Sequence, residues 1–510
     1  MRLSIIPFLL CLLPAFAQQA ELRTPPPGKA PRINGPSVYG VRPGKPFLYR
    51  IPCTGERPVR FTAKGLPQGI SLDGATGILS GKVPARKGEY RVQLGASNGA
   101  GKDGRLLRIV VGDTLALTPP MGWNDWYTHY TRITDKLMRQ GADAMIASGM
   151  ADAGYQYVNI DDCWSRKAGS TDPEIGGEPR GPNGEILTNA RFPDMKGLTD
   201  YIHSKGLKAG IYSSPGPATC AKFVASWQHE EQDARTFAAW GFDFLKYDWC
   251  TYGSIAKEKS LVAFQTPYKL MGGILPRLDR DVVFNLCQYG MGDVWKWGAE
   301  VGGHSWRTTG DLGLEKDSRL PGFYTIGLRN AKLHEFAGPG RWNDPDYLLI
   351  GTVGDARNQS APPKPVALTA DEQYSYMSMW SLMAAPLFYS GDMNHLDELT
   401  LNILTNTEII AINQDALGRQ AHIVRQNEDE LVLVKPLEGG AVAFGLFNLS
   451  QAPRKMRVTA KETGIKDGRE LRDAWRQKVA GKMGVDFEAT VARHGVEVFI
   501  APVQGRRQTR

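Results

Sequence analysis

The sequence has 510 residues, which is longer than one ordinary domain, so we expect two or three. With 42% hydrophobic and 22% charged residues it has the composition of a globular protein, which excludes disordered and fibrous classes. The formal net charge is +8, but Lys and Arg are scattered without a basic stripe, so we expect no nucleic-acid partner.

The first 17 residues are predicted to be a signal peptide. Arg2 precedes an apolar run over residues 5–16, and Ala-Phe-Ala at 15–17 is typical of a cleavage site. The run is too short to span a bilayer, and no other stretch reaches about 18 uninterrupted apolar residues, so we expect no membrane anchor. We therefore expect export to the periplasm or the extracellular space. Removal of Arg2 would lower the formal net charge from +8 to +7.

A Pro-rich linker at 18–31 leads to a predicted all-β module at 32–112. Gly- and Pro-containing turn signals recur at short spacing between alternating runs such as 106–111. Residues 65–72 and 76–81 resemble the immunoglobulin-type modules of exported bacterial proteins, which implies a β-sandwich. The residues leave open whether this module binds sugar or acts only as a spacer.

From 117 to 408 the pattern changes to repeating strand, loop and helix. One helix is predicted over 134–149, with Thr134 as its N-cap, and another is expected to end at Gly241. Eight strand candidates are expected to end near Asn124, Asp161, Ser213, Asp248, Cys287, Asp311, Asp346 and Gly391. Eight β–α units in about 280 residues predict a TIM (β/α)8 barrel. A doubly wound open sheet is the alternative, but no Gly-x-Gly-x-x-Gly turn opens a helix here.

From 409 to 505 the helix signals fade. Alternating segments joined by Gly-, Pro- and Lys-rich turns predict a C-terminal antiparallel β domain, a β-sandwich. The predicted fold class is therefore α/β, with a barrel between an N-terminal β-sandwich module and this domain.

Polar residues cluster where the predicted barrel strands stop, which is where α/β barrels place their active sites. They are Asp161, Asp162, Tyr212, Lys246, Asp248, Arg307, Asp311 and Asp346. The chain has no phosphate loop, no Gly-x-Ser-x-Gly elbow and no His-Glu-x-x-His motif. Carboxylates beside aromatic residues favour carbohydrate chemistry, because glycoside cleavage uses two carboxyl groups. The residues alone leave open a non-catalytic sugar-binding protein and a metal-dependent barrel hydrolase, with Asp161 and Asp162 as candidate ligands.

Five segments resemble, in the same order, the α-galactosidases of glycoside hydrolase family 27. They are residues 118–124, 161–164, 246–248, 305–311 and 338–346. The resemblance covers about residues 117 to 420. It implies a retaining exo-glycosidase that releases terminal α-linked galactose from oligosaccharides or glycans, with no cofactor and no metal.

The resemblance also implies roles for individual residues. Asp248 would be the nucleophile and Asp311 the general acid/base, with Arg307 as its positioning partner. The galactose pocket would be lined by Trp126, Asp161, Asp162, Tyr212, Lys246, Gln288, Tyr289, Arg307 and Asp346. We expect Lys246 and Arg307 to keep Asp248 ionised, and the pKa of Asp311 to be the higher of the two. The two carboxyl groups should lie roughly 5–5.5 Å apart, as retaining enzymes require.

The cysteines follow the same resemblance in part. It implies a disulfide between Cys220 and Cys250, beside the predicted nucleophile. Family partners for Cys163 and Cys287 are not evident, so we expect both to be free and buried. Five cysteines remain after signal cleavage, and this odd number requires at least one free thiol.

Three departures from the family pattern bear on specificity. Residues 287–290 read Cys-Gln-Tyr-Gly where members commonly have Cys-Glu-Trp, in the loop that reads position 2 of the sugar. Gln288 favours a 2-hydroxyl over an N-acetyl group. Tyr347 replaces the usual Met, and Trp249 enlarges the wall behind the nucleophile. Activity on β-L-arabinopyranosides, α-N-acetylgalactosaminides or dextran-type glucosides, as in isomaltodextranases, therefore remains open.

Overall fold

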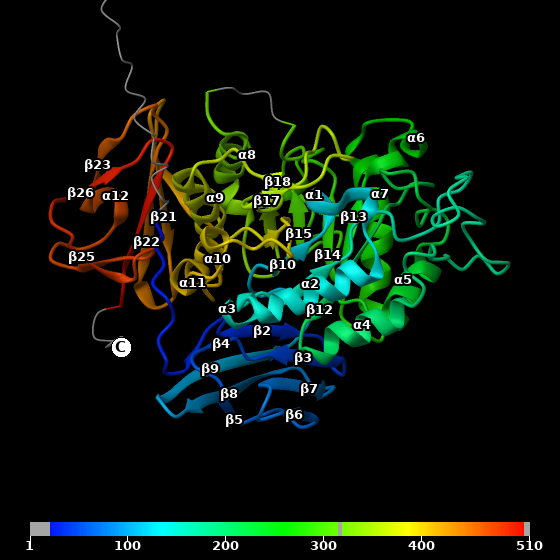
Figure 1. Ribbon diagram of the computed structural model, residues 1–510, viewed down its shortest axis with the longest axis horizontal. Helices are drawn as coiled ribbons and strands as arrows, with labels where there is room; N and C mark the ends of the chain where they lie inside the picture. Colours follow the sequence, from blue (N-terminus) through cyan, green and yellow to red (C-terminus); the bar gives the residue numbers. More distant parts are fainter. Residues whose placement is uncertain (1–20, 315–318, 504–510) are drawn as a thin grey trace, which may run out of the picture.

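The computed structural model describes residues 21–314 and 319–503, so the predicted signal peptide lies outside the described residues. Three parts follow one another along the chain (Figure 1). A β module (blue) packs under one end of a barrel surrounded by helices (cyan to yellow), and a second β domain (orange to red) packs on its flank. None of the helices in the described ranges has the length and apolar character needed to cross a membrane.

The N-terminal module is a sandwich of two sheets, as predicted. One sheet has the order β2-β9-β8-β5 and the other β3-β7-β6. Their strands are β2 (Val38–Val41), β3 (Pro46–Arg50), β5 (Arg60–Lys64), β6 (Ile70–Leu72), β7 (Ile78–Lys82), β8 (Gly88–Asn98) and β9 (Gly101–Val111), with β1 (Arg32–Ile33) paired to β4 (Cys53–Thr54). Along β8, Val92, Leu94 and Ala96 are buried while their neighbours are not, and they pack with Leu79 of the other sheet. This alternation is the period-two pattern of a half-buried strand.

The central part is the predicted (β/α)8 barrel. All seven neighbouring pairs in the order β16-β15-β14-β13-β12-β11-β10-β19 are parallel. The strands are β10 (Met121–Asn124), β11 (Tyr157–Asn159), β12 (Lys208–Ser213), β13 (Phe244–Asp248), β14 (Val283–Cys287), β15 (Ser305–Arg307), β16 (Trp342–Asp344) and β19 (Leu387–Tyr389). A parallel bridge between Leu348 and Tyr389 links the two ends of this sheet. The open doubly wound sheet is therefore excluded.

Helices connect these strands and cover the barrel. They are α1 (Trp126–His129), α2 (Asp135–Ala147), α3 (Met150–Ala153), α4 (Met195–Ser204), α5 (Glu230–Trp240), α6 (Gly253–Ala256), α7 (Leu261–Ile274), α8 (Gly322–Asn330), α9 (Ala370–Leu382), α10 (Glu398–Leu404) and α11 (Thr407–Asn413). The Thr134 hydroxyl caps α2 by accepting a hydrogen bond from the Leu137 amide, and α5 ends at Gly241 in the left-handed conformation, both as predicted.

Several strand ends differ from the sequence-based expectation. β15 stops at Arg307, β16 at Asp344 and β19 at Tyr389, so Asp311 and Asp346 lie on loops rather than at strand ends. Asp346 has a φ of 83°, which no strand residue adopts, and its amide donates to the Asp344 side chain. The chain therefore turns immediately after β16 and aims the Asp346 carboxylate back into the barrel mouth.

The C-terminal domain begins later than predicted, because α11 runs to Asn413 and the first strand starts at His422. Its main sheet has the order β20-β21-β22-β27-β24-β25, with β23 and β26 paired separately. The strands are β20 (His422–Gln426), β21 (Glu430–Pro436), β22 (Val442–Asn448), β23 (Arg454–Thr459), β24 (Glu470–Asp473), β25 (Lys478–Lys482), β26 (Asp486–Val491) and β27 (Val496–Ala501), and the short helix α12 covers Ala460–Thr463.

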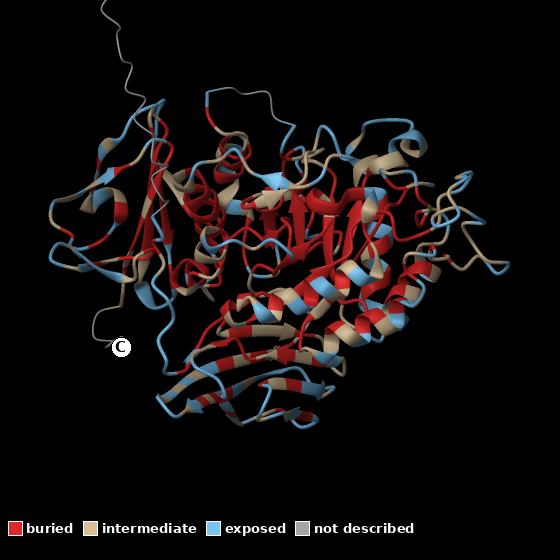
Figure 2. Cartoon of the chain, in the orientation of Figure 1, coloured by how far each residue is buried: buried red, intermediate tan, exposed pale blue. Residues whose placement is uncertain are grey.

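One face of this sheet continues the barrel core. On β21, Leu431 and Leu433 join the barrel's cluster, whereas Val432 and Val434 join the domain's own cluster. Helix α9 lies between barrel and sheet and is buried on every side from Glu372 to Leu382 (Figure 2). A helix without an exposed face belongs inside the protein, so the barrel and the C-terminal domain share one core.

Candidate active site

Strand β13 carries the first part of the site. Residues Phe244, Lys246 and Asp248 alternate with Leu245 and Tyr247, so the two sets point to opposite sides. Phe244 stacks edge-on against aromatic rings of β11 and β19 inside the barrel, with ring centroids 5.6 and 5.4 Å away. Lys246 and Asp248 therefore stand above an aromatic layer, at the carboxyl end of the strand.

Asp248 is held by two phenolic hydroxyl groups. The Tyr289 hydroxyl donates to Asp248 Oδ1 over 2.7 Å, and the Tyr212 hydroxyl donates to Oδ2 over 3.1 Å. Asp248 is only 5% exposed. Its two oxygens are thus both hydrogen-bonded, and the plane of the carboxylate is fixed.

Of the two cations expected to keep Asp248 ionised, Lys246 acts in the expected direction, but the net shift of the Asp248 pKa is upward. Burial raises the pKa of Asp248 above its usual value, although the charge of Lys246 and the Tyr289 hydrogen bond act to lower it. Both cations form their ion pairs with other carboxylates, Lys246 with Asp161 and Arg307 with Asp346 and Asp311. Removal of water at the barrel mouth therefore outweighs their attraction for Asp248.

Lys246 and Asp161 form one buried pair. Lys246 Nζ lies 2.8 Å from Asp161 Oδ2, which also accepts from the Asn124 amide over 2.9 Å. The ammonium lies between the rings of Tyr212 and Tyr347, 5.1 and 5.2 Å from their centroids. Burial lowers the pKa of Lys246, but Asp161 together with Tyr347, Cys287 and Asp248 raises it by more, so the net shift is upward. The pair presents a fixed cation next to Asp248.

Asp162 faces a different set of partners from Asp161. Its carboxylate accepts from the amides of Cys163 and Ala221 over 2.7 and 2.8 Å, which ties the loop after β11 to the loop that carries Cys220. Burial raises the pKa of Asp162 to about 6. The two adjacent aspartates therefore differ in their partners.

Arg307 joins two carboxylates on the other side of the site. Its Nη2 lies 3.1 Å from Asp311 Oδ1 and 3.0 Å from Asp346 Oδ2. Asp346 is fully buried and also accepts from the Tyr127 hydroxyl and the Leu312 amide. The Asp311 side chain is 40% exposed, so Arg307 holds a solvent-accessible carboxylate at the barrel mouth, as predicted for a positioning partner.

The loop after β14 brings Tyr289 to Asp248 and buries Gln288 beside it in the chain. Gln288 is fully buried; its amide nitrogen donates to the Met291 carbonyl over 3.2 Å, and its oxygen has no partner among the described residues. Tyr289 has a φ of 64°, and a Cβ on Gly290 would lie 2.4 Å from the Thr308 carbonyl oxygen. This strained turn buries Gln288 and aims Tyr289 inward. Contact of Gln288 with the sugar stays a prediction, because its oxygen has no protein partner among the described residues and its side chain is as buried as that of Asp346.

Trp126 stands at the rim of the site. It is partly exposed, follows β10 and packs edge-on against Tyr130 with ring centroids 5.2 Å apart. Its partial exposure suits a wall of the barrel mouth.

The predicted disulfide between Cys220 and Cys250 is confirmed. Cys250 Sγ lies 3.1 Å from the Tyr212 hydroxyl, and Cys220 Sγ lies 3.7 Å from the Tyr289 hydroxyl, so the bridge packs behind both donors to Asp248. Cys163 and Cys287 are free and buried, as expected. Over residues 21–314 and 319–503, the one grouping with metal-ligand spacing is this disulfide with Asp248, and bridged sulfurs are not thiolate ligands.

Three residues of the site escaped the sequence analysis. Tyr127 donates to Asp346 over 2.7 Å, Asn124 donates to Asp161, and Asp125 accepts from the Asp161 amide over 2.7 Å. Asn124 is the last residue of β10, and Asp125 and Tyr127 follow it within three residues. The density of polar and aromatic residues at 123–127 was the available signal, but nothing in it indicated which carboxylates these residues would meet.

Family models match nearly the whole described chain. The model described as Alpha galactosidase A matches residues 118–415, the Alpha galactosidase C-terminal beta sandwich domain matches 428–501, and the He_PIG model of Ig domains matches 30–112.

Relatives from plants and bacteria agree with these matches. An α-galactosidase of Cyamopsis tetragonoloba is 36% identical over 77% of this chain and 88% of its own. The α-galactosidase A of Cellvibrio japonicus is 39% identical over 76% of this chain and 92% of its own. A crystal structure from Bacteroides fragilis, provisionally assigned as an α-galactosidase/melibiase, has a TM-score of 0.86 and 38% identity, and the match covers 95% of this chain and all of that one.

Proposed function

The chain belongs to the α-galactosidase family, glycoside hydrolase family 27, and we propose that it is a retaining exo-glycosidase that hydrolyses terminal α-linked galactose from oligosaccharides or glycans. One observation carries this proposal at the level of the site. A buried carboxylate with both oxygens hydrogen-bonded, Asp248, shares the barrel mouth with a partly exposed carboxylate, Asp311, which an arginine holds. Two carboxyl groups in different environments are what double displacement requires.

In the first step Asp311 donates its proton to the glycosidic oxygen as that oxygen leaves C1. A carboxylate oxygen of Asp248 attacks C1 from the opposite face and forms a covalent galactosyl ester. The 40% exposure of Asp311 suits a group that must meet a leaving group of variable size. The hydrogen bonds from Tyr289 and Tyr212 hold the attacking carboxylate in one orientation, which reduces the entropy that the reaction must lose.

In the second step a water enters where the leaving group was. Asp311 takes a proton from this water, whose oxygen attacks C1 and displaces Asp248 as a carboxylate. The same two hydroxyl groups stabilise the negative charge that returns to Asp248. Two inversions at C1 release galactose with the anomeric configuration of the substrate.

The Lys246–Asp161 pair, Asp162 and the Arg307–Asp346 pair supply the remaining polar groups for the sugar hydroxyls. Each is already bonded to other protein groups, so none needs to reorganise when the sugar binds. Such preorganisation favours one sugar stereochemistry over its epimers, because an epimer leaves buried polar groups unpaired.

Stereochemistry and the Asp248→Ala variant test the proposal. Proton NMR of the hydrolysis of an aryl α-galactoside should show α-galactose as the first product, and Asp248→Ala should abolish turnover. Asp293→Ala, which removes an exposed carboxylate whose one ion pair among the described residues is with Lys296, is the matched control and should keep full activity. First appearance of β-galactose, or activity in Asp248→Ala, would overturn the proposal. Full activity of the enzyme in the presence of a chelator would exclude a metal-dependent hydrolase.

The sugar preference needs its own test. With Gln288 buried, Tyr289 and Tyr347 are the departures from the family pattern whose hydroxyl groups reach pocket carboxylates, Asp248 and Asp161. A panel of aryl glycosides (α-galactoside, α-N-acetylgalactosaminide, β-L-arabinopyranoside, α-glucoside) should give the highest kcat/KM with the α-galactoside. A higher value with another member would reassign the substrate within the family.

Export is part of the same proposal. The N-terminal sequence pattern and the Cys220–Cys250 bridge both suit an oxidising compartment outside the cytoplasm, periplasmic or extracellular. Mass spectrometry of the mature protein from its native host should find Gln18 as the first residue. An intact N-terminus in the cytoplasmic fraction would contradict export.

A further inference from the structure

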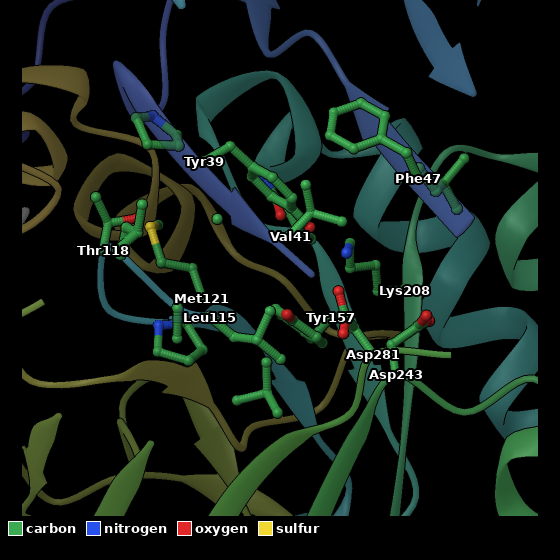
Figure 3. A pocket seen from close by; sticks show the side chains of 18 of the residues that line it. Tyr39, Val41, Phe47, Leu115, Thr118, Met121, Tyr157, Lys208, Asp243 and Asp281 are labelled. Carbon is green, nitrogen blue, oxygen red and sulfur yellow. The ribbon is translucent and has the colours of Figure 1, made fainter. Parts of the chain in front are cut away.

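A second cavity lies between the N-terminal module and the opposite end of the barrel (Figure 3). It has a volume of about 220 Å³, and its walls come from the module at Tyr39, Val41 and Phe47 and from the barrel at Tyr157 and Lys208. β13 runs from this end, just after Asp243, to Asp248 at the active site. Five residues of strand span about 16 Å, and the aromatic layer around Phe244 lies between, so the two sites are separate.

Two polar groups in this cavity have no hydrogen-bond partner among the described residues. Tyr157 is 7% exposed, and its hydroxyl forms no hydrogen bond with a described side chain or backbone group. The Lys208 ammonium forms no ion pair with a described carboxylate and lies 4.9 Å from the centroid of the Tyr39 ring. Both groups are therefore free to donate a hydrogen bond to a molecule that enters the cavity.

The carboxylates of the cavity are already oriented by other groups. Asp243 accepts from Arg280 over 2.6 Å and lies 2.8 Å from His203, and Asp281 accepts from the Arg42 amide over 2.8 Å. Figure 3 shows Lys208, Asp243 and Asp281 on one side of the cavity, Leu115 and Met121 on the other, and Tyr157 between them. The cavity therefore offers fixed donors and fixed acceptors opposite an apolar wall.

This arrangement selects the chemistry of the occupant. Hydroxyl groups both donate and accept, so a polyol can satisfy Lys208, Tyr157 and a carboxylate at once, whereas an anion would only accept and would face Asp243 and Asp281. The apolar wall suits the carbon face of a sugar ring. The volume is below the roughly 300–1,000 Å³ of sites for drug-sized ligands, which limits the occupant to about one ring.

We propose that this cavity is a second, non-catalytic site for a neutral monosaccharide, shared between the module and the barrel. The partial exposure of Tyr39, Lys208 and Asp281 leaves the cavity open to solvent. A sugar bound there contacts both parts and stabilises their association, because it binds only where both walls are present. The module thus has a role beyond spacing. The use of galactose as the probe rests on the proposed function, since the enzyme would release it nearby.

The test measures galactose binding to the full chain by calorimetry and locates the bound sugar in a crystal structure. The wild type should bind two galactose molecules, one in each site. Lys208→Met, which keeps the apolar stem and removes the ammonium, should bind one, with cavity affinity at least tenfold weaker and kcat/KM within twofold of wild type. Tyr157→Phe, which removes a single oxygen, should weaken the cavity site in the same way. Lys205→Met, outside the cavity and paired with Asp143, is the control and should keep both sites.

Three results would overturn the proposal. The first is a cavity that holds only water while the active site of the same crystal holds galactose. The second is unchanged two-site binding in both Lys208→Met and Tyr157→Phe. The third is galacturonate binding more tightly to the cavity than galactose, which would contradict the choice of a neutral ligand. Failure of galactose to bind the active site would count against the proposed function. Binding to the cavity is measured independently and would still test the second site.

Discussion

The hydroxyl of Tyr289 should control the ionisation of Asp248, and Tyr289→Phe removes that hydroxyl alone. The hydrogen bond is 2.7 Å long and reaches a carboxylate that is 5% exposed. A hydrogen bond to a charged group contributes about 1.5–3 kcal/mol, which corresponds to a factor of roughly 10 to 150 in an equilibrium constant. Because this bond lowers the pKa of Asp248, its loss raises that pKa.

The assay is the pH profile of kcat/KM with an aryl α-galactoside, which reports the ionisation of the free enzyme. Asp248 must be ionised to attack, so on the acidic limb kcat/KM should fall by roughly 10- to 150-fold in Tyr289→Phe. At the plateau, where Asp248 is ionised in both the wild type and the variant, the loss of kcat/KM should be much smaller. Tyr155→Phe is the matched control, because the buried Tyr155 hydroxyl has no hydrogen-bond partner among the described residues, and its profile should not move. An equal loss at every pH would refute the reasoning and assign Tyr289 a purely steric role.

Three further predictions concern stability. Burial raises the pKa of Asp162 to about 6, so this carboxyl favours the folded state below about pH 4, and that contribution is lost as the pH rises through 6. As the pH rises from 4 to 7, the free energy of unfolding of Asp162→Asn, measured in urea, should therefore increase by about 3 kcal/mol relative to wild type. Parallel curves of unfolding free energy against pH for the two proteins would contradict this. Arg307→Met should lower the free energy of unfolding by about 3–5 kcal/mol by leaving a buried carboxylate unpaired, with a smaller loss in Arg307→Lys; a loss below about 1 kcal/mol would count against this. Replacing Cys220 and Cys250 by Ala should cost about 3–4 kcal/mol from the bridge across 30 residues, whereas Cys53→Ala, which removes a buried free thiol, should cost much less.

Local signals in the sequence predicted the scaffold well. The cap at Thr134, the stop at Gly241 and the apolar strand that ends at Asp248 each depend on neighbouring residues, and the structure contains all three. The eight strands and the two flanking β domains follow from the same local patterns repeated along the chain.

The partners of the charged residues could not be predicted in this way. Lys246 lies two residues from Asp248 but pairs with Asp161, 85 residues away, because alternation along β13 and the position of β11 decide which carboxylate its side chain reaches. Tyr127 reaches Asp346 across 219 residues. Such contacts depend on the closure of the barrel, which no local pattern encodes.

The conformation of the loop after β14 could not be predicted from the sequence either, although its residues are neighbours in the chain. Its sequence predicts contact of both Gln288 and Tyr289 with the sugar, but not the φ of 64° at Tyr289 or the bond of its hydroxyl to Asp248. The docking of the module depends on contacts such as Arg42 with Asp281, 239 residues apart. The cavity that this docking creates therefore could not be predicted from the sequence.

The most direct test of the mechanism is to trap the covalent intermediate. A 5-fluoro-α-galactosyl fluoride reacts to form the ester but slows its hydrolysis, so the labelled enzyme can be digested and the modified peptide sequenced by mass spectrometry. The account predicts one galactosyl group per chain, on Asp248. A label on any other residue, or inactivation without a covalent adduct, would contradict the assignment of Asp248 as the nucleophile.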